Sequence, residues 1–412
     1  MTGLTRLNLH HAIMALTEAL DFVGVDEVHH GKRVALMAES IARELGWSER
    51  ECTFVLQAGM LHDCGVSQTR EHKHLTDSLE WDGAIEHCLR GERYLSDCGP
   101  LHGFAAAIRW HHTRWEHLPP ELDERTRKFA NLIFLADRVD VLQCPHITGE
   151  AERRGEILWE YPAIIERVRS LGGSLFAPEL VEAFAAAASA EAFWLAQDPR
   201  YFLEDLSGRA TAVPGVTLNA PEVLSMARLF SHVVDAKSAY TQDHSLRVSR
   251  IARYLAEKAG CTGETLDLVE TAGLLHDLGK LRVPDEIIEK PAPLTKEERA
   301  LVTRHAYDTF RILNRVFADC PIPYWAGSHH ENLLGTGYPF HRPGKSLDLE
   351  ARVISVADIF QALSQERPYR GQWSKDRVYS HLQSLVAQEK VDAHVVALLG
   401  DELDACYALA TA

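Results

Sequence analysis

The sequence predicts an all-α protein made of two tandem helical bundles that are related by duplication. Two observations lead to this prediction. Apolar residues recur at helical spacing through most of the chain, and strand signals are sparse. Histidines and aspartates also recur at equal intervals in two halves of the chain, as a duplicated fold requires. A length of 412 residues is enough for two or three domains, each with its own core.

The composition is that of a soluble globular protein, with 46% hydrophobic and 25% charged residues. No apolar run reaches the length of a membrane span, and the first residues lack a basic segment followed by an apolar core, so we expect a cytoplasmic protein. The formal net charge of −16 disfavours duplex nucleic acid and anionic membranes as partners. The eight cysteines form no CxxC pair, which argues against a zinc ribbon.

The first half is expected to be helical throughout. An amphipathic helix is predicted within residues 1–29, and its apolar stripe is formed by Leu9, Ile13, Leu16 and Leu20. A helix then begins at His30 and stops at Gly46, and another over about 49–61 ends in a His-Asp pair. The candidate metal ligands of this half are His30, His62, Asp63, His87, His111, His112 and Asp137.

Residues 198–220 are the best linker candidate, because prolines and glycines are frequent there and hydrophobic periodicity is weak. We therefore predict a first domain over 1–197 and a second over 221–412.

The helical pattern of the first half begins again after the linker. A helix from His244 stops at Gly260, and a capping box at Thr295 starts the helix that carries His305. The candidate ligands of this half are His244, His276, Asp277, His305, His329, His330 and Asp358. Among these candidate ligands, the first two histidines of each half lie 32 positions apart, and the third and fourth lie 24 apart. Equal intervals within helices and unequal ones across loops indicate two homologous domains.

Five imidazoles and two carboxylates in the second half exceed what one tetrahedral ion needs. Two ions fit better if Asp277 bridges them. One ion would be bound by His244, His276, Asp277 and Asp358, and the other by Asp277, His305, His329 and His330. Nitrogen and oxygen ligands without a thiolate suit iron or manganese. Two such ions can activate a nucleophile and stabilise a phosphoryl transition state, so the set predicts phosphoester hydrolysis.

The stretch Leu274–Lys280 carries the candidate catalytic residues Asp277 and Lys280. Lys280 is close enough in sequence to sit near the ions without binding them, and it can neutralise charge on the phosphoryl oxygens or the leaving group. We expect the helix to end at the His-Asp pair and the chain to turn with the conformational freedom of Gly279.

Several motifs of the second half resemble the HD-GYP branch of the HD-domain phosphohydrolases over about 221–400, and a more distant HD-domain resemblance covers about 25–200. The motifs are His276-Asp277-Leu-Gly-Lys280, His305, His329-His330-Glu331, Gly335-Thr-Gly337-Tyr338-Pro339, Val356-Ala-Asp358 and Arg367-Pro-Tyr369-Arg370. The resemblance implies an all-α domain with a metal centre in a helical bundle. It also implies hydrolysis of a bacterial cyclic dinucleotide, chiefly cyclic di-GMP, to a linear dinucleotide or to mononucleotides.

The resemblance further implies which residues contact the substrate. Gly337, Tyr338 and Pro339 would line the substrate site, and Arg367 and Arg370 would contact guanine or phosphate. An arginine offers paired donors to either group, and these two supply the positive charge that this acidic chain otherwise lacks.

Three departures from the family pattern bear on the second half. Leu334 and Gln361 stand where the family usually has aspartates, and we expect them to tune the loop or the surroundings of the ligands. Tyr240 lies one helical turn before His244, where some members place a glutamate that binds a third ion. A two-metal centre is therefore predicted.

The first half keeps a complete candidate ligand set, to which Asp26 could add a carboxylate, but it loses the recognition loop. Val66 replaces the lysine, Thr113 follows the histidine pair, and no Gly-Tyr-Pro motif is present. Two interpretations stay open: a metal-bound domain with regulatory or nucleotidase activity, or a metal-free domain that mainly packs. Arg33 and Arg247 recur three residues after the first histidine of each half, and we expect structural ion pairs from them.

The sequence thus predicts a metal-dependent phosphodiesterase with two divalent ions in the second domain, and it leaves further metal in the first domain open. Cyclic di-GMP is the expected substrate. The alternatives are mixed cyclic GMP-AMP, or a cyclic-dinucleotide receptor with little turnover. A homodimer is allowed, and the input signal is not determined by the sequence.

Overall fold

The computed structural model describes residues 7–21, 23, 29–66, 68–77, 79–81, 83–203, 206, 217–238, 243–366 and 371–412. The chain forms two compact units. The N-terminal unit consists of Leu16–Val66 and Arg70–Val216, and the C-terminal unit of Met1–Ala15, Ser67–Thr69 and Thr217–Ala412. Residues 7–15 thus group with the C-terminal unit, and the domain boundaries drawn from the sequence stay predictions.

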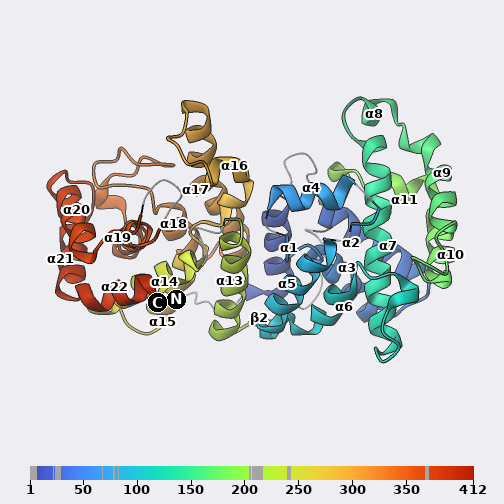
Figure 1. Cartoon of the computed structure of the whole chain (residues 1–412), viewed down its shortest axis with the longest axis horizontal. Helices are drawn as coiled ribbons and strands as arrows, with labels where there is room; N and C mark the ends of the chain where they lie inside the picture. Colours follow the sequence, from blue (N-terminus) through green and yellow to red (C-terminus); the bar gives the residue numbers. More distant parts are fainter. Residues whose placement is uncertain are drawn as a thin grey trace. The chain divides into compact units, whose positions relative to one another are not determined.

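The predicted all-α class is confirmed, as Figure 1 shows. In the described ranges the one regular sheet has two short antiparallel strands, β1 (Leu7–Asn8) and β2 (Thr217–Leu218), with Leu7 opposite Leu218. None of the described helices combines the length and the apolar character that a membrane crossing needs.

The N-terminal unit is a bundle centred on α2, which packs against α3, α7 and α10. α6 lies against both α5 and α7. α1 (Leu9–Leu20) begins in the C-terminal unit and ends in the N-terminal one. The further elements of the N-terminal unit are α2 (His30–Glu44), α3 (Glu49–Leu61), α4 (Thr69–Asp77), α5 (Ala84–Ser96), η2 (Gly99–Phe104), α6 (Ala105–Trp110), η3 (Trp115–His117), α7 (Glu124–Ile147), α8 (Gly149–Arg154), α9 (Ile157–Arg169), α10 (Pro178–Ala187) and α11 (Glu191–Leu195).

The C-terminal unit repeats this arrangement around α14, which packs against α15, α19 and α22, while α17 packs against α18 and η4. Its elements are α13 (Ala220–Asp235), α14 (His244–Lys258), α15 (Glu264–Leu275), η4 (Leu278–Arg282), α16 (Asp285–Ile288), α17 (Lys296–Val316), α18 (Ile322–Gly327), η5 (Gly344–Ser346), α19 (Leu349–Ser364), α20 (Lys375–Ala387), α21 (Ala393–Asp401) and α22 (Leu403–Thr411). The contacts α2–α3, α2–α7 and α5–α6 recur as α14–α15, α14–α19 and α17–α18, as duplication predicts.

The helix ends follow from local sequence. The predicted capping box is present at α17, where the hydroxyl of Thr295 accepts from the Glu298 backbone N–H. Gly46 and Gly260 adopt φ of 70° and 93°, so each terminates its helix in the left-handed region that glycine favours. The helix predicted within 1–29 is confirmed in its middle, over Leu9–Leu20.

The helices that carry the first histidine of each unit begin after a residue in a rare backbone conformation. His29 precedes α2 with φ of 81°, and Asp243 precedes α14 with φ of 59°. Non-glycine residues seldom adopt positive φ, and such residues persist where the surrounding structure holds them. The same conformation at both equivalent positions places His30 and His244 at the first turn of their helices.

The expected role of Gly279 is corrected by the structure. Gly279 lies in η4 without a positive φ, so the chain does not use its left-handed freedom. A side chain is excluded there instead, because a Cβ would lie 2.1 Å from the carbonyl oxygen of His305. Gly65 has the same relation to His87, at 2.0 Å. In both units, therefore, the segment after the His-Asp pair can lie directly against the helix that bears the next histidine.

We predict that Gly279→Ala destabilises the protein by about 1–3 kcal/mol, because the new methyl group must displace the backbone of α17. Thermal unfolding of the two proteins measures this. Gly103→Ala is a matched control, since a Cβ at Gly103 has no atom within 4 Å. Equal midpoints for Gly279→Ala and the parent protein would contradict the close-approach explanation.

Candidate metal centres

The structure brings all seven predicted C-terminal ligands together. His244 opens α14, His305 projects from α17 and Asp358 from α19. His276-Asp277 directly follows the end of α15, and His329-His330 follows the end of α18 after Ser328. All are buried except the half-buried His330. The residues come from five helices, so the cluster forms only when the bundle is folded.

Backbone carbonyls orient three of the histidines. The Nδ1 atoms of His276, His305 and His329 lie 2.7, 2.5 and 2.6 Å from the carbonyl oxygens of the residues three positions before them. A carbonyl oxygen only accepts, so each Nδ1 carries the proton and each Nε2 presents its lone pair to the cluster. His244 is oriented by Gln361, whose Oε1 lies 2.5 Å from its Nδ1.

The two carboxylate oxygens of Asp277 face different histidines. Oδ2 lies 3.4 Å from Nε2 of His244 and 3.3 Å from Nε2 of His276. Oδ1 lies 3.5 Å from Nε2 of His305 and 3.7 Å from Nε2 of His329. Asp358 is on the Oδ2 side, with its Oδ1 3.4 Å from His244 Nε2. This is the arrangement that a carboxylate bridging two cations needs.

The donor set fits divalent cations. Nε2 of His276 and Oδ1 of Asp277 are buried and have no hydrogen-bond partner among the described residues, a costly arrangement that a bound cation would relieve. Burial lowers the pKa of His305 to about 3 and that of His330 to about 4, so both imidazoles are neutral near pH 7 and available as ligands.

Lys280 contacts the carboxylate that is predicted to bridge the two ions: its Nζ lies 2.5 Å from Oδ2 of Asp277. Burial alone would raise the pKa of Asp277, but the electrostatic interactions and hydrogen bonds with its neighbours, including the ammonium of Lys280, outweigh burial and hold this pKa well below its ordinary value. Asp277 is therefore ionised, and Lys280 adds a positive charge at the edge of the cluster.

The Gly-Tyr-Pro loop folds back onto the histidine pair. The backbone N–H of Tyr338 donates to the carbonyl of His330 at 3.2 Å, and the two rings lie 4.8 Å apart. A Cβ at Gly337 would lie 2.5 Å from the same carbonyl oxygen. The Tyr338–Pro339 peptide bond is cis. Tyr338 is half-buried, and its ring also lies 6.5 Å from that of His305.

Glu331 is a functional candidate whose role the sequence did not reveal. Its buried carboxylate accepts from the backbone N–H groups of Phe340 and Arg342, at 2.6 and 3.1 Å. It thereby fastens the far end of the loop to the histidine pair. The only sequence signal was its place next to His330. The predicted substrate contacts Arg367 and Arg370 lie outside the described residues, as do Tyr240 and Asp26.

We predict that Glu331→Ala raises KM about 10- to 100-fold, because two buried backbone donors lose a charged acceptor and the loop detaches. Steady-state kinetics on the metal-loaded protein test this, and metal content is expected to stay unchanged. Glu350→Ala serves as the control, since it removes a carboxylate from the first turn of α19 instead of the one that accepts from the loop. An unchanged KM would contradict the anchoring role.

The N-terminal unit repeats the cluster with its own seven residues. Oδ2 of Asp63 lies 3.2 Å from Nε2 of His62, and Oδ1 lies 3.6 Å from Nε2 of His87. Oδ1 of Asp137 lies 3.3 Å from Nε2 of His30. The carbonyls of Gly59 and Ile108 orient His62 and His111, as in the other unit, and His112 completes the group beside Asp137. All seven predicted N-terminal residues therefore converge.

Comparisons with known proteins agree with this duplicated architecture. Residues 28–142 and 228–395 each match an HD-domain family model. The 3'3'-cGAMP-specific phosphodiesterase 1 of Vibrio cholerae is 39% identical over 399 residues, which cover 94% of this chain and 90% of that protein. The chain belongs to the HD-domain family of cyclic-dinucleotide phosphodiesterases.

Two further comparisons concern its parts and its fold. A cyclic di-GMP phosphodiesterase response regulator of Xanthomonas campestris is 35% identical over 166 residues, 39% of this chain and 42% of that protein. A crystal structure of a cyclic GMP-AMP specific phosphodiesterase from V. cholerae aligns over 97% of this chain and 98% of that chain, with a TM-score of 0.63 and 23% identity. The latter supports the fold. The predicted resemblance to the HD-GYP branch is confirmed, and HD domains are metal-dependent.

The two HD domains of this phosphodiesterase differ in what surrounds their ligands. Asp140 takes the place of Gln361, with Oδ2 2.7 Å from Nδ1 of His30. Arg33 makes the expected structural ion pair, with Asp140, at 2.6 Å. Arg247 does not parallel it; its Nε donates to the backbone carbonyl of Ala412 at 3.1 Å. The equal spacing of the two arginines therefore did not imply equal partners.

Charge is also distributed differently around the N-terminal ligands. Arg138 is buried and donates to Oδ2 of Asp137 at 2.7 Å, whereas Ile359 follows Asp358 in the other HD domain. Val66 occupies the position of Lys280 and is 1% exposed. In the N-terminal HD domain, therefore, a positively charged side chain, Arg138, contacts Asp137. In the C-terminal one, the charged side chain of Lys280 contacts the aspartate of the His-Asp pair.

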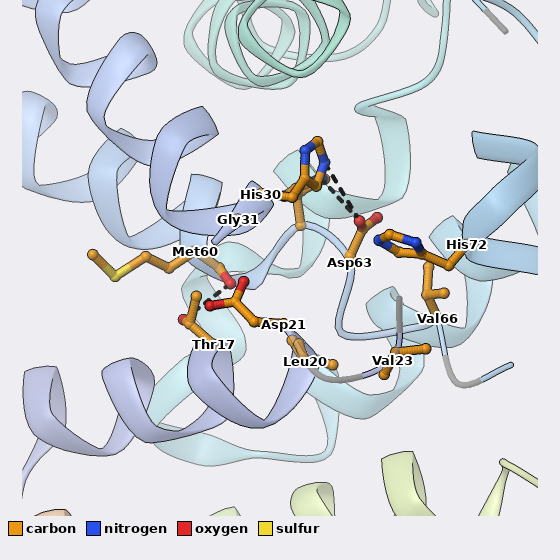
Figure 2. A pocket seen from close by; sticks show the side chains of 11 residues that line it. Thr17, Leu20, Asp21, Val23, His30, Gly31, Met60, Asp63, Val66 and His72 are labelled. Carbon is orange, nitrogen blue, oxygen red and sulfur yellow. Dashed lines mark hydrogen bonds and ion pairs between the residues drawn. The ribbon is translucent and has the colours of Figure 1, made fainter. Parts of the chain in front are cut away.

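A small cavity of about 20 Å³ adjoins the N-terminal cluster. Figure 2 shows the ring of His72 beside Asp63, with His30 above them. Its lining residues are Thr17, Leu20, Asp21, Val23, His30, Gly31, Met60, His62, Asp63, Val66 and His72. The cavity accommodates a small polar group and no nucleotide ring.

Proposed function

We propose that the C-terminal HD domain, residues 221–412, hydrolyses a phosphodiester bond of a guanine-containing cyclic dinucleotide. The seven converging residues would bind two divalent cations, with iron or manganese preferred because no thiolate contributes. The observation that carries this proposal is the position of Asp277, whose two oxygens face separate histidines while Lys280 contacts one of them. Bound cations would supply an activated water and Lewis-acid stabilisation of the phosphoryl group.

The residues of the chain would perform the remaining work. Asp277 and the oriented imidazoles would hold the cations at which the phosphate is bound, and the ammonium of Lys280 would balance charge that develops on the phosphate oxygens or on the leaving group. The half-buried ring of Tyr338 offers a surface for stacking a base near His330. Water forms the new P–O bond, the ester P–O bond breaks, and the leaving ribose oxygen takes up a proton, which gives a linear dinucleotide.

Of the two guanine-containing substrates, we propose 3'3'-cGAMP ahead of cyclic di-GMP. The expectation of cyclic di-GMP rested only on motifs in the C-terminal half of the sequence. The relative that is similar along 94% of this chain is named for 3'3'-cGAMP, whereas the cyclic di-GMP enzyme of X. campestris is similar over 39%. Similarity in both HD domains is the reason for this preference.

For the N-terminal HD domain, residues 1–197, we propose metal binding and hydrolysis of a terminal phosphate of the linear product. The complete ligand set supports metal binding. The small cavity and the lack of a Gly-Tyr-Pro motif favour a compact phosphate group over a ring-shaped dinucleotide. Product analysis separates this activity from a purely regulatory role, because regulation alone leaves the linear product intact.

The test combines metal analysis with a product assay on one sample. Protein loaded with iron or manganese is incubated with 3'3'-cGAMP and, separately, with cyclic di-GMP. We expect a linear dinucleotide from at least one of them, with faster cleavage of 3'3'-cGAMP. About two ions per chain would indicate one occupied centre, and about four would indicate both. Tight binding with both rings left intact would instead identify a receptor and overturn the proposed activity.

A further inference from the structure

The His-Asp pairs of the two units differ in the cation that accompanies them. In the C-terminal unit the ammonium of Lys280 contacts Asp277. In the N-terminal unit the equivalent Val66 is apolar, and its side chain lines the small cavity beside Asp63. A phosphate held at the N-terminal centre therefore lacks the donor that its C-terminal counterpart has at this position.

A histidine from another helix faces the same cavity. His72 lies on α4, is 8% exposed, and lines the cavity together with Asp63. Its ring lies 6.2 Å from that of His30, edge to face. Figure 2 shows it reaching from α4 to the side of Asp63. The corresponding stretch of the second half, residues 278–304, contains no histidine at all.

The helix that carries His72 is fastened to the turn after the His-Asp pair. Arg90 on α5 donates through its Nε to the carbonyl oxygen of Gly65 at 2.8 Å, and its guanidinium also binds the carboxylate of Glu71. Glu71 directly precedes His72. One side chain thus ties the chain next to Asp63 to the chain next to His72, which holds the imidazole in place at the cavity.

We propose that His72 donates a hydrogen bond to a phosphate oxygen at the N-terminal centre, in the role that Lys280 has in the C-terminal one. The ligand class is a terminal phosphate, as in a phosphomonoester or inorganic phosphate, because the cavity that His72 shares with Asp63 is too small for a nucleotide ring. This inference rests on the proposed metal binding of the N-terminal HD domain. An imidazole N–H is a suitable donor to an anionic oxygen, and its position on α4 compensates for the loss of the lysine.

The experiment measures inorganic phosphate binding by calorimetry, on metal-loaded full-length protein carrying His276→Ala and Asp277→Ala so that only the N-terminal centre responds. We expect His72→Ala to weaken phosphate binding about 10- to 100-fold, the usual worth of a hydrogen bond to a charged group. Metal content should not change. His74→Ala is the matched control, because His74 is exposed on the same helix and stacks on Trp81 at 5.2 Å, and it should bind phosphate like the parent.

A compensating variant makes the test specific. Val66→Lys in the His72→Ala background should restore at least part of the phosphate affinity, since it returns the donor to the Lys280 position. His72→Gln, which keeps an N–H donor, covers the case in which His72→Ala lowers the thermal midpoint. Unchanged phosphate affinity in His72→Ala, an equal loss in His74→Ala, a parallel loss of metal, or no phosphate binding by the parent would each overturn the proposal. Phosphate binding that depends on His72 without phosphomonoester hydrolysis would uphold the site and reject the N-terminal activity.

Discussion

Asp277→Asn is expected to abolish cyclic-dinucleotide hydrolysis and to release metal from the C-terminal centre. The two oxygens of this carboxylate face separate sets of histidines, at 3.3–3.7 Å. The amide of asparagine has one oxygen, which is a weaker ligand than a carboxylate oxygen, and it directs an N–H donor toward one of the two sets of histidines. Losing the cations removes several kcal/mol of transition-state stabilisation, which corresponds to a rate loss of about a thousandfold or more. Turnover and metal content, measured on the same sample, test both parts.

Asp63→Asn is the matched control for that change, because Asp63 has the same geometry toward His62 and His87 in the N-terminal unit. It should lower the metal content but leave ring opening within about twofold of the parent. The reverse pattern, with ring opening lost in Asp63→Asn and kept in Asp277→Asn, would contradict the proposal and place ring opening in the N-terminal HD domain. Loss in both variants would mean that the two centres work as one.

The ligand clusters were predictable because the chemistry limits the residue types and the duplication fixes the intervals. His244 and Asp358 lie 114 positions apart, yet their side chains meet at 3.4 Å. No local pattern predicts such a contact. The recurrence of the same residue types at equal intervals in a second half does, because two unrelated segments would not keep this spacing without a shared three-dimensional requirement.

What the sequence could not reveal are contacts whose partners lack a chemical signature. Glu331 binds backbone N–H groups, which every residue except proline offers, so nothing in the sequence marks Phe340 and Arg342 as its partners. His72 is one of 22 histidines and becomes notable only once it shares a cavity with Asp63. The prediction that Gly279 provides a left-handed turn was wrong for the same reason. A left-handed turn and a close approach both select glycine, and only the position of the His305 carbonyl distinguishes them.

Lys280→Gln is expected to lower kcat about 100- to 1,000-fold while metal content and KM change little. Its ammonium lies 2.5 Å from Oδ2 of Asp277 without belonging to the ligand set, so the charge should act mainly when negative charge develops in the transition state. An uncharged amide of similar length removes that charge and keeps most of the packing. Single-turnover kinetics with metal analysis separate this effect from a loss of cations.

Lys290→Gln is the control for this variant, because Lys290 lies in the same unit and pairs with Glu298 at 2.6 Å, away from the cluster. Its removal should not change turnover, since a partly exposed ion pair contributes at most about 1 kcal/mol to stability. If Lys280→Gln loses metal in proportion to activity, the lysine serves to orient Asp277 and is not a partner of the phosphoryl group. A normal kcat with full metal content would show instead that hydrolysis does not need a positive charge at position 280, where the N-terminal HD domain has the neutral Val66. The functional difference between the two HD domains would then lie in the Gly-Tyr-Pro loop.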